Sequence, residues 1–240
     1  MTPSPSPVGI LLVDKPTGYT SMDICAIIRS RVRRGGPHIP KRIKVGHAGT
    51  LDPMATGLLI VMIGKATKLC DALMADTKVY EADVDLSRTS TTDDAEGLIT
   101  PLPAPPTPPQ RATIEQVIQA SFTGTIMQAP PAYSAINIAG QRAYDLARAG
   151  RPVELAARPV RIAAFDIADY AWPLLRVRIT CGKGTYIRSL ARDLGRALGV
   201  GGMLTALRRT QSGAYAVQHA RTLDQLPDPI TQADLFPLPA

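Results

Sequence analysis

The chain has 240 residues, with 27 basic and 20 acidic side chains and a formal charge of +7 at pH 7. Its hydrophobic content of 45% is that of a chain with a packed core, which excludes a mostly disordered protein. No apolar run reaches the ~18–20 residues that a membrane-spanning helix needs, and the N-terminus has no secretory signal. Three widely separated cysteines form no disulfide framework and lack metal-ligand spacing. We therefore expect a cytoplasmic protein that does not associate with a membrane.

The positive charge narrows the class of protein further. Arginine supplies 20 of the 27 basic side chains, and its planar guanidinium binds phosphates bidentately and stacks on bases. A pI near 9.5 is typical of nucleic-acid binders and also of many ordinary basic enzymes. Composition alone leaves both classes open.

The N-terminal third alternates apolar runs with turn residues. Its helix has a polar residue at the expected N-cap and isoleucines on one face, which is the pattern of an amphipathic helix. In chain order, we expect a disordered tail at 1–7, a strand at 9–15, a helix from Thr20 or Ser21 to about Arg34, a basic loop at 33–42, a buried strand at 57–64 and a short helix at 65–74.

The rest of the chain continues this mixture. Residues 78–86 alternate, so that Tyr80, Ala82 and Val84 share the apolar face. Six prolines within 100–109 predict an exposed connector. The remaining predicted elements are a helix from a capping box at Thr113 and Gln116 to about Phe122, a helix at 141–149, a strand at 174–181, a helix at 185–198, a basic segment at 207–213 followed by one short strand, and a turn at 222–226.

Strands interspersed with helices predict an α+β fold, with a mixed, largely antiparallel central sheet flanked by helices. The flanking halves of the Pro-rich stretch are each short for a stable core, so we expect one domain over residues 8–226. Residues 227–240, with four prolines, predict a loose tail.

The densest group of unusual residues is VGHAGTLDPMATGLL at 45–59, between two apolar runs. Its glycines allow positive φ or close approach of a ligand to the backbone. Asp52 precedes a proline, which is the pattern of a helix N-cap followed by Pro at N1. The alternative is a lone carboxylate presented on a loop as nucleophile or base. For His47 the sequence likewise leaves two interpretations open, a structural histidine of the loop or core and a catalytic residue.

GHAGTLDPMATGLLIV resembles the signature of the TruB-type tRNA pseudouridine synthases. Five further blocks resemble the family in the same order, and together they cover most of residues 9–226. They are GILLVDKPTGYTS at 9–21, KVYEADVDL at 78–86, QAPPAYSAINIAGQRAYDLARAG at 128–150, CGKGTYIRSLARDLG at 181–195 and LTALRRTQSG at 204–213.

The resemblance implies a catalytic domain with a pseudouridine-synthase-like fold. It also implies an enzyme that isomerises uridine to pseudouridine at position 55, in the T-loop of tRNA, and that needs no cofactor or metal. Such an enzyme extrudes the nucleotide into a pocket before the glycosidic bond is broken. By matching positions, Asp52 is the essential aspartate, Tyr80 stacks on the flipped uracil and Arg188 pairs with Asp52. The remaining pocket residues implied are His47, which inserts into the T-loop, and Tyr186 and Lys183, which frame the pocket.

The resemblance also implies how the RNA is held. An insertion at about 127–155 would clamp the T-loop through Tyr133 and Arg142. Phosphate contacts, which give affinity and salt sensitivity, would come from basic side chains. We assign these contacts to Lys41, Arg42, Arg208 and Arg209. The expected partner is the tRNA T-stem-loop, with the protein acting as a monomer and needing no protein partner.

Three departures from the family pattern stand out. Many members carry a C-terminal RNA-binding domain of the PUA type, and the stretch after the matched blocks is too short for one. Asn137 stands where a lysine is expected, and the Pro-rich stretch is longer than expected. Of the adjacent Asp93 and Asp94, the second better fits a structural or pocket-ordering aspartate.

Three rival functions remain open on the sequence. The first is a non-catalytic RNA-binding or RNA-folding module. The second is a guide-RNA-dependent synthase of the related kind that modifies ribosomal RNA. The third is a metal-free hydrolase that uses Asp52, although no second carboxylate lies at motif spacing.

Overall fold

The computed structural model describes residues 6–40, 42–134, 137–138, 140–151 and 155–238. The chain forms two compact units. The first comprises the residues up to Val79 and from Arg208 onward, and the second runs from Tyr80 to Leu207. Two long strands, β4 (Lys78–Asp85) and β12 (Met203–Ser212), have residues in both units.

The first unit is built around strand β3 (Thr56–Ile63), which is buried along almost its whole length. On one edge it pairs antiparallel with β1 (Gly9–Lys15). On the other edge it pairs antiparallel with β2 (Val45–His47) and, near its start, parallel with Arg208 and Arg209 of β12. The other elements of this unit are α1 (Ser21–Arg33), the 3-10 helix η1 (Gly64–Leu69), α2 (Cys70–Ala75), β13 (Tyr215–Ala216), η2 (Val217–His219) and η3 (Gln232–Asp234).

The local reasons for these elements are visible in the sequence. Thr20 is the N-cap of α1, and its hydroxyl accepts from the Asp23 N–H while the Asp23 carboxylate accepts from the Thr20 N–H, which completes a capping box. The predicted strand at 9–15 is β1, with the same bounds. The core contains Ile10, Leu12, Ala48, Leu58, Ile60, Met62, Ala66 and Leu73.

The Pro-rich tail is not loose over its described residues. Phe236 exchanges two backbone hydrogen bonds with Ile10 of β1, at 2.8 and 3.0 Å. Ile230 is fully buried, and the Arg31 guanidinium of α1 donates to the carbonyls of Leu223 and Leu226, at 2.8 Å each. The expectation of a loose tail was wrong, because Phe236 pairs with β1 and Ile230 is buried.

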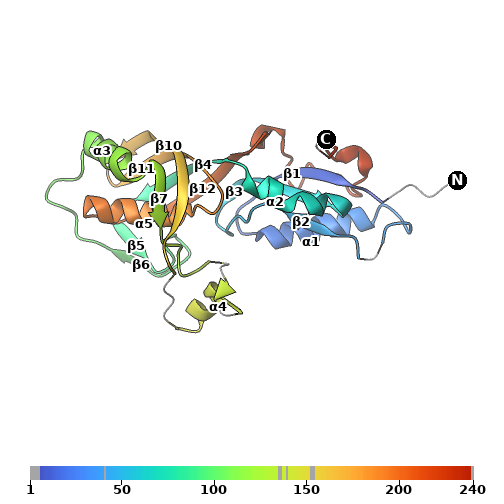
Figure 1. The fold of residues 1–240 in the computed structure, drawn as a ribbon, viewed down its shortest axis with the longest axis horizontal. Helices are drawn as coiled ribbons and strands as arrows, with labels where there is room; N and C mark the ends of the chain where they lie inside the picture. Colours follow the sequence, from blue (N-terminus) through green and yellow to red (C-terminus); the bar gives the residue numbers. More distant parts are fainter. Residues whose placement is uncertain (1–5, 41, 135–136, 139, 152–154, 239–240) are drawn as a thin grey trace. The chain divides into compact units, whose positions relative to one another are not determined.

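The second unit has the sheet order β12, β4, β11 (Leu174–Cys181), β10 (Arg158–Ala171) and β7 (Gly124–Gln128), with β10 antiparallel to both its neighbours. Helix α3 (Arg111–Ser121) contacts α5 (Ile187–Leu198) and β10 (Figure 1). The smaller elements are the β5 (Arg88–Ser90) and β6 (Ile99–Pro101) hairpin, the β8 (Asn137–Ile138) and β9 (Gln141–Arg142) hairpin, and α4 (Ala143–Arg148).

The fold class is the predicted one, a mixed α+β arrangement with a largely antiparallel sheet. The apolar face of 78–86 is buried as predicted, and strand 174–181 has the predicted bounds. The prediction of a capping box at Thr113 was wrong, because α3 begins at Arg111 and its N-cap residue is Gln110. The basic segment at 207–213 belongs mostly to β12, which runs through it to Ser212, and the short strand that follows is β13. Among the described residues, no helix is both long enough and apolar enough to cross a membrane.

Candidate active site

The loop that carries Asp52 connects two strands of the first unit. The first of them, β2, ends at His47, which lies opposite Val61 of β3. The ladder continues one step further, because the Ala48 N–H donates to the Ile60 carbonyl at 2.9 Å. The chain then leaves the sheet until β3 begins at Thr56. Asp52 therefore lies on a short excursion that is fixed to β3 at both ends.

Asp52 begins a turn and does not cap a helix. The Ala55 N–H donates to the Asp52 carbonyl at 3.1 Å, and Pro53 occupies the second position of this four-residue turn, where its fixed φ is favourable. No helix follows, because the chain enters β3 directly. The N-cap interpretation of Asp52 is therefore wrong. The side chain is partly exposed, which suits a carboxylate presented on a loop.

The residues on either side of Asp52 are tied to the segment that links β1 to α1. On one side, the buried Ser21 hydroxyl accepts from the Leu51 N–H at 2.9 Å and donates to the Leu51 carbonyl at 3.1 Å. On the other side, the Pro53 carbonyl accepts from the Gly18 N–H at 2.9 Å and from the Lys15 ammonium at 3.3 Å. Backbone bonds on both sides therefore limit the movement of the aspartate.

Lys15 is fully buried, and its ammonium also donates to the carbonyls of Pro16 and Tyr19, at 2.9 and 2.7 Å. A buried ammonium is stable only when its donors are satisfied, and carbonyl oxygens do this here. Lys15 thus joins the segment before α1 to the turn after Asp52.

Arg209 supports the same loop from β12. Its side chain is almost fully buried, with a relative exposure of 1%, and it donates to the carbonyls of Leu58 at 2.7 Å and Gly49 at 3.1 Å. Gly49 and Gly57 both have positive φ, and a Cβ at Gly57 would lie 2.3 Å from the Arg209 carbonyl oxygen. The assignment of Arg209 as a surface phosphate contact was therefore wrong, because its guanidinium faces the protein interior.

Arg208, the neighbouring arginine, points to the other face of β12. It forms a bidentate ion pair with Asp14, with N–O distances of 2.7 and 3.0 Å, and its side chain is 39% exposed. The carboxylate of Asp14 already uses two of its donors. A role for Arg208 in phosphate binding remains a prediction.

His47 is partly buried, and its Nδ1 is buried with no hydrogen-bond partner among the described residues. Burial lowers the pKa of His47, and the nearby positive charge of Arg209 lowers it further. The imidazole is therefore held in its neutral form. A neutral ring can pack against a nucleobase without a charge to desolvate.

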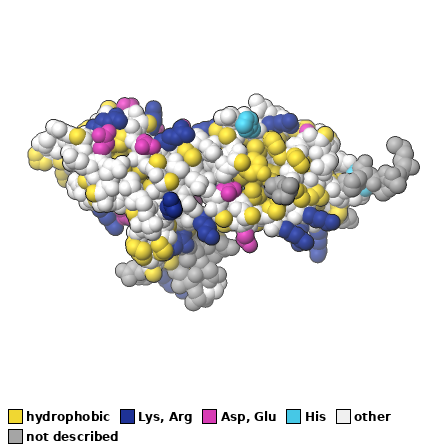
Figure 2. Space-filling view, turned by 45° about the horizontal axis from the view of Figure 1, so that its top comes forward, with side chains coloured by type: hydrophobic (Ala, Val, Ile, Leu, Met, Phe, Trp, Pro, Cys, Tyr) yellow, Lys and Arg dark blue, Asp and Glu magenta, His cyan; other side chains and the backbone are white. Residues whose placement is uncertain are grey.

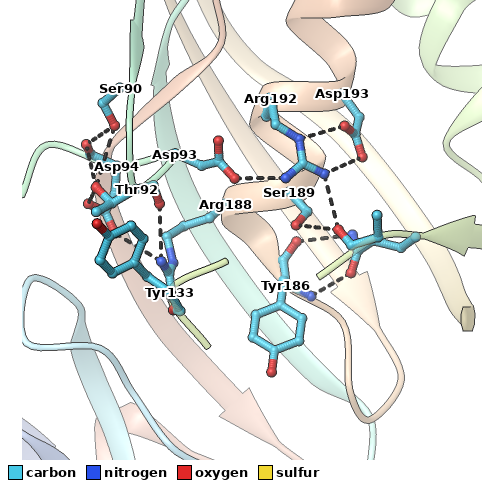
Figure 3. Close-up of polar contacts among 12 residues, drawn as sticks. Ser90, Thr92, Asp93, Asp94, Tyr133, Tyr186, Arg188, Ser189, Arg192 and Asp193 are labelled. Carbon is cyan, nitrogen blue, oxygen red and sulfur yellow. Dashed lines mark hydrogen bonds and ion pairs between the residues drawn. The ribbon is translucent and has the colours of Figure 1, made fainter. Parts of the chain in front are cut away.

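In the second unit, helix α5 organises a polar network around Arg188, as Figure 3 shows. The Arg188 guanidinium lies 3.4 Å from the Asp94 carboxylate and donates to the carbonyls of Thr92 and Tyr133, at 3.1 and 3.0 Å. Arg188 and Asp94 are both buried. The Asp94 carboxylate also accepts from the Thr92 hydroxyl and from the Glu96 N–H. Arg188 therefore joins the segment around Asp94 to the start of the predicted RNA clamp.

One helical turn later, Arg192 makes a second set of bonds. It pairs with Asp93 and Asp193, at 2.8 Å each, and donates to the Ala129 carbonyl at 3.1 Å. Ser189 donates to the same carbonyl at 2.9 Å. Asp93 has φ of 63°, which is uncommon for a residue other than glycine, and burial raises the pKa of its carboxyl while Arg192 opposes that rise.

The aromatic candidates are placed by backbone contacts in this unit. Tyr80 lies on β4 with only 9% of its surface exposed. Tyr186 precedes α5, and the buried Gln128 side chain accepts from its N–H at 2.8 Å and donates to its carbonyl at 3.1 Å. The Arg158 guanidinium lies over the Tyr186 ring, 5.4 Å from its centre. Figure 3 shows this ring pointing away from the Arg188 network.

The predicted site residues thus fall into two sets. The first unit carries His47, Asp52, Arg42, Arg208 and Arg209, and the second carries Tyr80, Tyr133, Lys183, Tyr186 and Arg188. Lys183 and Arg42 are exposed. Lys41 lies outside the described residues, as does the side chain of Arg142.

Sequence reasoning missed the supports of these residues. Ser21 and Lys15 belong to the quoted block GILLVDKPTGYTS, but their local pattern signals only a strand end and a helix start. For Arg192 the sequence pattern predicts a position on a solvated helix face. Two of its partners, Ala129 and Asp93, lie 63 and 99 residues away in the sequence, so local periodicity does not reveal them.

Comparison with known structures defines the class of this fold. The chain aligns with a chain in the crystal structure of a Cbf5-Nop10-Gar1 complex, with a TM-score of 0.68 and 29% identity over 91% of this chain and 53% of that chain. It also aligns with a chain in the structure of an H/ACA RNP bound to a substrate RNA containing 2'-deoxyuridine, with a TM-score of 0.64 and 28% identity over 91% of this chain and 52% of that chain. This chain spans about half the length of each of the two matched chains.

Family models place the chain more narrowly. Residues 38–187 match the N-terminal domain of the TruB family of pseudouridylate synthases, and residues 188–235 match the C-terminal domain of tRNA pseudouridylate synthase B. The chain belongs to the TruB family of pseudouridylate synthases. The second match includes part of the Pro-rich tail.

Curated relatives agree with this membership. A tRNA pseudouridine synthase B of Thermobifida fusca is 51% identical over 227 residues, which cover 91% of this chain and 74% of that protein. Proteins of the same name from Corynebacterium aurimucosum and Streptomyces coelicolor are 48% and 46% identical, over 92% and 94% of this chain and 72% and 75% of theirs.

Proposed function

We propose that this protein converts uridine to pseudouridine in the T-loop of tRNA, at position 55, with Asp52 as the catalytic residue. Family membership gives the reaction class, and the names of the relatives give tRNA as the substrate. We further propose that it acts as a monomer in the cytoplasm, where tRNA is found.

The reaction is an isomerisation, so atoms and electrons balance without a co-reactant. The bond between N1 of uracil and C1′ of ribose breaks, and a bond between C5 and C1′ forms. The hydrogen on C5 leaves as a proton and N1 gains a proton. A group that attacks either ring or removes a ribose proton must be accessible to the substrate, and Asp52 lies on a loop and is partly exposed.

The observation that carries this proposal is the way Asp52 is held. Its carbonyl starts a turn, and the residues on both sides are clamped by Ser21, Lys15 and Gly18, while its side chain stays partly exposed. This rigidity is what a catalytic group requires, because misplacement by about 1 Å costs on the order of 10²-fold in rate.

We assign the other roles by family position. Tyr80 stacks on the flipped uracil, His47 inserts into the T-loop, Arg188 pairs with Asp52, and Tyr186 and Lys183 frame the pocket. An aromatic ring with a polar tip suits the first role, and the neutral imidazole of His47 suits the second. Tyr133 and Arg142 belong to the clamp, with Arg42 and Arg208 contacting phosphates.

The test uses an unmodified tRNA transcript that carries tritium at C5 of its uridines. Because C5 loses its hydrogen when it bonds to C1′, each turnover releases one tritium to water. We expect the native protein to release one tritium per tRNA, and a transcript with cytidine at position 55 to release none. Asp52→Asn, which keeps the side-chain volume, should abolish release while it still binds the RNA.

The same assay distinguishes the proposed function from the three alternative functions that the sequence leaves open. A non-catalytic RNA-binding module would bind the transcript and release no tritium. A guide-RNA-dependent synthase would need added guide RNA and proteins before it released tritium. A hydrolase would release free uracil or another fragment and change the mass of the RNA, whereas isomerisation leaves the mass unchanged.

A further inference from the structure

One buried amide of the second unit is not used in the function proposed above. The Gln128 side chain is only 2% exposed, and it makes two hydrogen bonds to a single residue 58 positions away in the sequence. Its Oε1 accepts from the Tyr186 N–H at 2.8 Å, and its Nε2 donates to the Tyr186 carbonyl at 3.1 Å (Figure 3). Because water does not replace these partners in the interior, both bonds are costly to lose.

The two bonds reproduce what a neighbouring strand would provide to Tyr186. In an antiparallel ladder, a residue is held when its N–H and its carbonyl both bond to one partner residue. Glutamine and asparagine are the side chains that carry a carbonyl oxygen and an NH2 group on one carbon, as a peptide group does. Tyr186 has an extended backbone, with φ of −104° and ψ of 114°. The amide therefore fixes this backbone at the point where the chain turns into α5.

Gln128 is itself held on the sheet. It is the last residue of β7 and lies directly opposite Arg158, the first residue of β10. Directly opposite residues of antiparallel strands project their side chains from the same face of a sheet. The next residue, Ala129, accepts at its carbonyl from the Ser189 hydroxyl of α5 at 2.9 Å. The amide therefore stands on a backbone that is bonded to both the sheet and the helix.

Arg158, on the same face, holds the ring of Tyr186. Its guanidinium lies 5.4 Å from the centre of this ring and donates to the Gly184 carbonyl at 2.9 Å. Lysines and arginines lie at several places on the face that Figure 2 presents, whereas this guanidinium is paired with a ring and a carbonyl. A cation over an aromatic face is attracted by the quadrupole of the ring. Arg158 therefore restricts the ring, while Gln128 fixes the backbone that carries it.

Both contacts act on a side chain whose position matters for the reaction. Tyr186 frames the pocket in the function proposed above, and a displacement of about 1 Å in a pocket costs on the order of 10²-fold in rate. We infer that Gln128 is a positioning residue for the isomerisation, which fixes the backbone of Tyr186 while Arg158 fixes its ring, so that the phenol meets the extruded uridine in one orientation. This inference rests on the proposed function for the role of Tyr186.

The first test compares tritium release in a single turnover with RNA affinity. Gln128→Met keeps the length of the side chain and removes both hydrogen bonds, so release should slow by about 30- to 100-fold while the Kd for a T-stem-loop RNA changes by less than about threefold. Release by Gln128→Met at the native rate would overturn the inference.

Ser189→Ala is the matched control. It also removes a buried hydrogen bond between α5 and this segment, but that bond goes to Ala129 and not to Tyr186. Its release rate should stay within about threefold of the native rate, because the pocket tyrosine keeps its place. Equal losses in Gln128→Met and Ser189→Ala would mean that the packing of the segment matters and not the amide, which overturns the inference.

A double-mutant cycle on the release rate separates positioning from general stability. If Gln128 acts through Tyr186, Gln128→Met should have little further effect once Tyr186→Ala has removed the ring. Losses that multiply would overturn the inference. Arg158→Met is the second variant, for use if Gln128→Met does not fold. It should slow release by about two- to fivefold, and this loss should also vanish in Tyr186→Ala. Release by Arg158→Met at the native rate would overturn the inference in that case.

A spectroscopic test needs no activity. With fluorotyrosine in place of tyrosine, the fluorine NMR signal of Tyr186 is assigned by its loss in Tyr186→Phe. This signal should be single and narrow in the native protein, broaden or split in Gln128→Met, and stay narrow in Ser189→Ala. An unchanged signal in Gln128→Met would overturn the inference even if release is slow. If the signal changes but the native protein releases no tritium from tRNA, the positioning of Tyr186 by Gln128 stands and the proposed function fails.

Discussion

The loop around Asp52 and the network along α5 both depend on buried or half-buried arginines, but the hydrogen-bond partners of these arginines differ. Arg209 donates to two backbone carbonyls, of Leu58 and Gly49. Arg188 and Arg192 reach carbonyls as well, but each also pairs with an aspartate, Asp94 or Asp93. A carbonyl is part of the backbone and remains when a side chain is replaced. A carboxylate belongs to a second side chain, which can be removed together with its partner.

This difference predicts how each region tolerates substitution. At the buried Arg188–Asp94 pair, loss of one side chain leaves the other charge buried without this ion pair, and loss of both removes the mismatch. In the Asp52 loop, no second substitution can compensate for the loss of the arginine. The predictions below test this contrast, beginning with the largest expected effect.

Asp94→Ala should lower the free energy of unfolding by about 3–5 kcal/mol, because it removes the carboxylate beside a buried guanidinium. The double variant Asp94→Ala, Arg188→Met should lose less than the sum of the two single variants. Urea unfolding of the four proteins forms a double-mutant cycle. Additive losses would show that the two side chains do not interact.

Arg209→Lys should cost about 2–3 kcal/mol, because an ammonium cannot reproduce the fork that reaches the Leu58 and Gly49 carbonyls. Since these carbonyls shape the loop of Asp52, kcat should fall more than KM changes. Arg208→Lys is the matched control. Its ion pair with Asp14 is 39% exposed on the arginine side, so water screens it and the cost should stay below about 1 kcal/mol. Similar losses in both variants would contradict the contrast.

Gly57→Ala should be destabilising by about 1–3 kcal/mol. The residue has φ of 97°, and a Cβ would lie 2.3 Å from the Arg209 carbonyl oxygen. Gly124→Ala separates strain from collision, because Gly124 has φ of 78° with open space around it. Chemical unfolding should therefore show a clearly smaller loss for Gly124→Ala. Equal losses would mean that backbone strain alone accounts for the effect.

His47 should titrate below its ordinary pKa of 6.5, because burial and then Arg209 disfavour the imidazolium. The unfolded chain then binds a proton at higher pH than the folded chain does. Stability is therefore complete above pH 6.5 and declines as pH falls from 6.5 toward the folded pKa. NMR titration gives the pKa directly, with signals assigned by substitution of the other two histidines. His47→Gln should lose less stability than the native protein over the same acid range.

Much of the fold was predictable where the signal is local. Thr20 caps α1 through Asp23 three residues later, and Leu175, Val177 and Ile179 alternate along β11, so their elements appear in the sequence with nearly correct bounds. Strand β10 was missed, because register shifts after Ile162 and Ile167 break its alternation.

The candidate site was predictable only in part. Asp52 and His47 stand in a distinctive block of glycines, but a local pattern also allowed Asp52 to cap a helix. Arg209 was assigned to the surface because it lies in a basic segment. Its burial depends on carbonyls 151 and 160 residues away in the sequence, and only the folded chain brings these together.

The central claim is that Asp52 performs the isomerisation, and tritium release in a single turnover tests it most directly. With enzyme in excess over tRNA labelled at C5, the native protein should release one tritium per position-55 uridine. Asp52→Asn should release at least about 10³-fold more slowly, a loss of roughly 4 kcal/mol in transition-state stabilisation, at equal RNA occupancy. Release by Asp52→Asn at the native rate would contradict the account.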